Sequence, residues 1–202
     1  FRFMTLRNQI STIVACIALH TPLYANSPFY GTFELGNSTS NFGNIEASAP
    51  LNNTTTSDVI DDKDNSTYAG IGLGYDWQNT SLRSEIQYNK YGSQEFIDDM
   101  LFNGVGAERT TVKVKQEALM FNLLYDFKIT SSNFVPYVGG GVGISKFKVS
   151  ATQVDNPPQV GRLANFAENS DTNFAWNLVV GANYNLTTTT TIGLGYRYTD
   201  LG

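Results

Sequence analysis

One stretch near the C-terminus, residues 173–200, most constrains what this chain can fold into. It reads NFAWNLVVGANYNLTTTTTIGLGYRYTD, with apolar or aromatic residues at every second position on both sides of a threonine-rich turn. Because side chains alternate faces along a strand, the stretch predicts a β-hairpin with one apolar face and one small or polar face. Such a hairpin suits either a soluble barrel with an apolar interior or a membrane barrel with an apolar exterior.

The same alternation recurs along the rest of the chain and predicts an all-β fold. Seven strands are expected in total, at residues 28–36, 67–77, 82–89, 110–127, 134–150, 173–186 and 192–199. Eight antiparallel strands make a barrel whose interior is just filled by its own side chains. We therefore predict an up-and-down transmembrane β-barrel of eight strands, with seven visible before the chain ends and the last strand lacking.

The connections between the predicted strands alternate in length. The first, third and fifth are long and polar, at residues 37–66, 96–109 and 151–171, whereas the others span only a few residues. Outer-membrane barrels have this asymmetry, with short periplasmic turns and long external loops. It favours a membrane barrel over a soluble one and places the mature N-terminus in the periplasm.

The polar faces of the strands predict a crowded lumen. Those of segments 67–77, 134–150 and 192–199 consist largely of glycine, which leaves room for larger side chains from other strands. Five charged residues are expected to point inward and form a structural charge network: Glu34, Asp76, Arg83, Glu85 and Arg197. If Trp77 faces Leu82, Asp76 lies directly opposite Arg83. A gate whose ion pairs switch to admit small ions is the alternative interpretation of these charges.

The first 25 residues are typical of a secretory signal peptide. Arg7 precedes an apolar run at residues 10–19, and Leu23-Tyr24-Ala25 ends in a small residue suited to cleavage. The predicted division is therefore a signal peptide at 1–25 and a barrel at 26–202. Cleavage would remove Cys16 and His20, which are the chain's one cysteine and one histidine. No catalytic, metal or cofactor site is expected, and the chain is predicted not to be an enzyme.

The composition limits the partners. A formal net charge of -5 without any basic cluster in the sequence argues against a nucleic-acid partner. Charged residues make up only 15% of the chain and aromatic residues 13%, as expected for a wall that faces lipid. The expected partner of the wall is outer-membrane lipid.

Three stretches carry a resemblance to a known group of proteins. They are LMFNLLYDF at 119–127, FVPYVGGGVGIS at 134–145 and GLGYRYTDLG at 193–202. These resemble the opacity-type and rickettsial surface-antigen families, which are small barrels akin to the OmpA transmembrane domain. The resemblance implies a monomer in the bacterial outer membrane, whose exposed loops act as a surface antigen or adhesin toward host cells and antibodies. An additional role as a structural protein of the envelope is also expected. A passive small-solute channel and a secreted soluble ligand-binding barrel remain alternatives.

Overall fold

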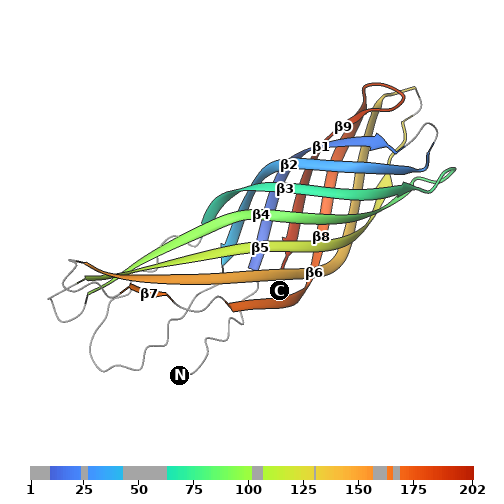
Figure 1. The fold of residues 1–202 in the computed structure, drawn as a ribbon. Helices are drawn as coiled ribbons and strands as arrows, with labels where there is room; N and C mark the ends of the chain where they lie inside the picture. The colour runs from blue at the N-terminus through green and yellow to red at the C-terminus, as the bar shows by residue number, and fades with distance from the viewer. Residues whose placement is uncertain are drawn as a thin grey trace.

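The computed structural model describes residues 10–23, 27–42, 63–101, 107–129, 131–156, 163–165 and 169–202 and contains a closed antiparallel barrel (Figure 1). The strands are β1 (Ile10–Pro22), β2 (Phe29–Phe42), β3 (Lys63–Asp76), β4 (Leu82–Leu101), β5 (Ala107–Asp126), β6 (Phe134–Asn156), β7 (Leu163–Asn165), β8 (Asn169–Asn185) and β9 (Thr191–Asp200). Among the described strands, β7 pairs with the C-terminal end of β6 alone. The other eight strands form the barrel, which closes by the pairing of β9 with β1. The predicted up-and-down barrel of eight strands is confirmed.

The barrel wall is apolar on its outside and polar on its inside. Outward-facing Leu73, Phe121 and Leu194 are 61%, 52% and 69% exposed. Arg83 and Arg197 lie in the lumen, with only 6% and 3% exposed. This arrangement is the reverse of a water-soluble barrel, and it confirms the prediction that the apolar face points outward into lipid. Among the described residues, no helix is long and apolar enough to cross a membrane.

The eighth strand differs from the sequence-based expectation. β1 occupies the position between β2 and β9, so the barrel has no open edge there and lacks no strand in this structure. All of β1 lies within the predicted signal peptide, and its residues 10–19 are the apolar run of that prediction. The run also alternates, with Ile17 and Leu19 facing outward and Val14 and Ala18 buried, so it meets the requirements of a barrel strand as well. Cleavage after Ala25 stays a prediction, and the histidine and cysteine that it would remove belong to β1 in this structure.

The strands extend further than predicted toward the long connections. Residues 37–42 and 63–66 belong to β2 and β3, and 96–101 and 107–109 belong to β4 and β5; 151–156, 163–165 and 169–171 belong to β6, β7 and β8. The predicted loop boundaries are therefore wrong, and the rest of the three loops lies outside the described residues. Where the strands continue past the apolar band toward the long connections, they need no apolar face. The alternation of apolar and polar residues therefore ends there, although backbone pairing continues.

The short connections all lie at the opposite end of the barrel (Figure 1). The predicted register of one of them is confirmed, because the Trp77 amide donates to the Leu82 carbonyl oxygen at 3.1 Å and Asp76 lies opposite Arg83. Exposed aromatic rings gather at this end, and Tyr125 and Phe127 pack with their ring centroids 5.1 Å apart. Such aromatic residues are expected where a barrel wall meets the membrane–water interface.

Candidate functional site: the lumen charge network

The first centre of charge in the lumen is the pair formed by Arg197 of β9 and Glu34 of β2. The two guanidinium terminal nitrogens lie 3.1 and 3.2 Å from the two carboxylate oxygens, a bidentate geometry that strengthens an ion pair. Arg197 also donates to Gln87 Oε1 at 2.7 Å and to the Tyr68 hydroxyl. The Tyr68 hydroxyl oxygen in turn lies 2.7 Å from Glu34 Oε2 and 2.8 Å from Asn89 Oδ1. Strands from opposite sides of the lumen are thereby joined through its centre.

Arg83 of β4 forms the second centre. Its Nε and Nη2 donate to the two oxygens of Asp126 at 2.7 and 2.9 Å, and its Nη1 lies 3.2 Å from Glu85 Oε1. The Tyr30 hydroxyl donates to the same Glu85 oxygen at 2.7 Å. The Arg83 guanidinium also lies 5.4 Å from the centre of the Tyr137 ring, within cation–π range.

Amide side chains connect the two centres. The Gln87 Nε2 donates to Glu34 Oε1 at 3.0 Å and to Glu85 Oε2 at 3.1 Å. Asn122 donates to Gln87 Oε1 at 3.1 Å, and Asn177 donates to Asn122 Oδ1 at 2.8 Å. A buried charge is costly unless it is paired and hydrogen-bonded, so these contacts allow ionised groups to occupy the lumen.

Four of the five predicted network residues meet in this arrangement: Glu34, Arg83, Glu85 and Arg197. Asp76 faces Arg83 in the strand register, but Arg83 makes its two short carboxylate contacts with Asp126. The network prediction omits Asp126. A usable signal is present in the sequence, because Asp126 and Asn122 lie on the same non-lipid face of a strongly alternating strand.

Apolar and aromatic side chains also fill the lumen, in a cluster that overlaps the network. The buried residues of this cluster include Tyr68, Tyr91, Met120, Phe147 and Leu201. Tyr68 belongs to the network as well, and Met120 lies opposite Gln87. At the end with the short turns, an open cavity of about 410 Å³ is lined by residues that include His20, Asp76, Arg83 and Asp126. No group of three or more potential metal ligands occurs among the described residues. The arrangement is suited to filling and stabilising the lumen.

The crowding of the lumen supplies a stability prediction at Gly72. A Cβ atom built there would lie 2.6 Å from the Ile86 carbonyl oxygen and 2.8 Å from both Gln87 Cγ and Thr32 Oγ1. Gly72→Val is therefore expected to destabilise the barrel by about 1–3 kcal/mol, despite the better strand propensity of valine. The measurement is urea unfolding in lipid vesicles, with Ala69→Val on the outward face of the same strand as the control. Equal stability of the two variants would contradict a packed lumen.

A closed barrel with a lipid-compatible exterior and a filled polar lumen defines a small transmembrane β-barrel protein. The sequence agrees, since the family model described as outer membrane protein beta-barrel domain matches residues 11–202. The chain belongs to this family, and it is a protein of the bacterial outer membrane. The narrower resemblance to opacity-type and rickettsial antigens stays a prediction.

The individual proteins that match this chain share low sequence identity with it. Outer membrane protein PagN of Salmonella typhimurium (strain LT2) is 27% identical over 144 residues, which cover 66% of this chain and 56% of PagN. The chain thus spans little more than half the length of that relative. Neisserial surface protein A matches at 12% identity over 96% of this chain and 97% of its own, with a TM-score of 0.36. The translocator domain of the autotransporter NalP from Neisseria meningitidis matches at 9% identity over 96% and 87%, with a TM-score of 0.42.

Proposed function

We propose that this protein is a non-enzymatic, monomeric surface protein that displays its long connections to the outside, as a surface antigen or adhesin. The partners proposed for these connections are host-cell surfaces and antibodies, and no nucleic acid is among them. The barrel holds the connections in place, and recognition comes from the connections between β2 and β3, between β4 and β5, and between β6 and β8.

The observation that carries the proposal is the length of the strands on the side of the long connections. A transmembrane β-strand needs about 9–11 residues. β4 and β5 have 20 residues each and β6 has 23, and all three extend toward the long connections (Figure 1). At roughly 3.3 Å per residue, ten surplus residues extend about 33 Å along a tilted strand. Such an extension supports display of the connections well away from the lipid surface.

The filled lumen favours display over solute passage. The charge network and the apolar cluster that overlaps it both occupy the lumen, and most of their side chains are buried. Bulk flow of solute through this described part of the barrel would require the ion pairs and the buried rings to separate. We therefore expect no stable conductance in planar bilayers, and a steady ohmic current from the purified protein would favour the channel alternative.

The display proposal predicts where a protease cuts and what the cut removes. Intact cells that carry the protein are treated with proteinase K, and we expect cleavage only within the three long connections. The clipped barrel is expected to remain heat-modifiable, because its strands stay paired: unboiled protein migrates differently from boiled protein on a detergent gel. Adherence of the cells to epithelial monolayers should fall to the level of cells that lack the protein.

The matched control replaces residues 43–62 with a short turn, which shortens the first long connection and leaves the strands intact. This variant should reach the surface in the same amount and keep its heat-modifiable migration. Cuts in the short turns, or adherence unchanged after all three connections are cut, would contradict the proposal.

A further inference from the structure

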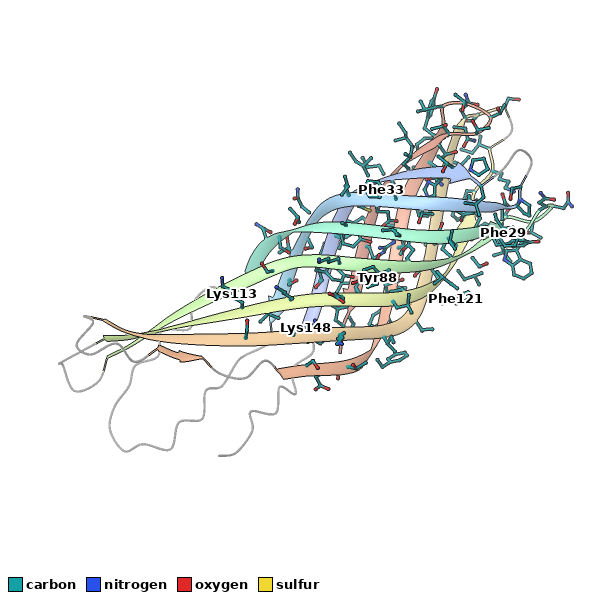
Figure 2. All side chains as sticks on the ribbon, in the orientation of Figure 1. Phe29, Phe33, Tyr88, Lys113, Phe121 and Lys148 are labelled. Carbon is teal, nitrogen blue, oxygen red and sulfur yellow. The ribbon has the colours of Figure 1, made fainter. Side chains whose placement is uncertain are left out.

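Most of the chain's lysines lie on one part of the outer wall. Five of its seven lysines belong to β4, β5 and β6: Lys90, Lys113, Lys115, Lys146 and Lys148. All five alternate in step with the lipid-facing residues of their strands, and their side chains are exposed or half-buried. Figure 2 shows Lys113 and Lys148 further toward the long connections than Tyr88 and Phe121. The sequence itself contains no basic run, because these residues come from three strands.

The strand register places these lysines at the edge of the apolar band. Tyr88, Leu119, Ile144 and Phe174 form one row of outward-facing residues across β4, β5, β6 and β8. The next outward row consists of Lys90, Glu117 and Lys146. On β4, β5 and β6 the wall therefore changes from apolar to charged within one outward-facing position, which is where lipid tails give way to headgroups.

The row after that contains a like-charge pair. Lys115 lies directly opposite Lys148, although like charges at directly opposed positions of a sheet are destabilising. Glu117 is the one carboxylate among the described outward-facing side chains of β4, β5 and β6, and it lies directly between Lys90 and Lys146. The net formal charge of this part of the wall is +3, from four lysines and one glutamate: Lys90, Lys115, Lys146, Lys148 and Glu117. Lys113 is not included in this sum. An external anion would remove this repulsion.

We propose that Lys90, Lys115, Lys146 and Lys148, here called the basic face, bind the phosphate groups of lipid headgroups in the outer leaflet of the membrane. Ammonium groups on long flexible stems can reach from an apolar wall to the headgroup level. They bind phosphate as compact point charges with several donors. The position at the band edge favours a membrane lipid over a soluble anion, because a lipid anchored in the same leaflet presents its phosphate at this height. The proposal rests on the location in the outer membrane and does not depend on adhesion.

The test compares Lys115→Gln/Lys148→Gln with the wild type in vesicles of phosphatidylcholine, with or without phosphatidic acid. Native mass spectrometry counts the phosphatidic acid molecules retained by the released protein. We expect the wild type to retain phosphatidic acid and the double variant to bind it about 30-fold more weakly, as for two lysines lost beside an anionic surface. The affinity should also fall as salt rises. Lys128→Gln, at the opposite end of the barrel, is the matched control and should bind as the wild type does.

Two further sets of variants control for the loss of charge and for failure to fold. Lys115→Arg/Lys148→Arg keeps both charges and should restore retention, and the two single glutamine variants replace the double variant if it fails to give a heat-modifiable band. Equal retention by the wild type and the glutamine variants would overturn the proposal. So would tight, lysine-dependent binding of soluble heparin with no preference for phosphatidic acid vesicles, since the basic face would then be a glycan site.

Discussion

Replacing Arg197 with methionine is expected to destabilise the folded barrel by about 3–5 kcal/mol, because Glu34 would be left as a buried charge without its cation. The two side chains are nearly inaccessible, and Arg197 is bidentate on the carboxylate. Methionine retains much of the volume, so the loss reports on charge more than on packing. The measurement is the free energy of unfolding in urea, with the protein folded in lipid vesicles.

The matched comparison adds Glu34→Gln to the Arg197 substitution. The double variant has no unpaired charge, and glutamine can still accept a hydrogen bond from Tyr68. It is expected to recover most of the lost stability. A single-variant loss below about 1 kcal/mol, or a double variant at least as unstable as the single one, would show that the pair is not held as a buried ion pair.

The second large effect is expected at Leu123, in the middle of the outward apolar face of β5, between Leu119 and Phe127. Leu123→Arg should destabilise the barrel by about 2–4 kcal/mol, the cost of a guanidinium near the bilayer midplane. Leu123 is 48% exposed, and in a water-soluble protein a site this exposed would tolerate arginine with little change in stability. The sign and size of the effect therefore report directly on what surrounds the wall.

Depth along the wall provides the control for this substitution. Tyr88→Arg introduces the same side chain in the last apolar row, beside the row that contains Lys90. Its cost should be only about 0–1 kcal/mol, because arginine there reaches the headgroups. Equal and small effects of both substitutions in vesicles would contradict a lipid-facing wall.

Much of the barrel could be predicted from the chain alone, for a local reason. Side chains at i and i+2 share a face of any strand, so alternation such as Leu119, Phe121, Leu123 and Tyr125 identifies the apolar face of the strand without knowledge of its neighbours. The short turn after Trp77 leaves few possible registers, so the opposition of Asp76 and Arg83 could be predicted as well. The extended hairpins beyond the membrane escaped prediction because their strands need no apolar face.

Alternation was enough to reveal the strands and which side chains share a face, because both depend on residues two apart in one strand. The alternating lengths of the connections then favoured an apolar face that points outward into lipid, which leaves the charges of the other face in the lumen. Only the closed barrel decided which charges meet. Arg197 pairs with Glu34 across 163 residues, and Arg83 turns to Asp126 instead of the aspartate opposite it. The register of the β5–β6 hairpin places Lys115 and Lys148 opposite each other. The physical reason is that contacts across a lumen depend on the curvature of the wall and on the combined register of all its strands, which no local pattern encodes.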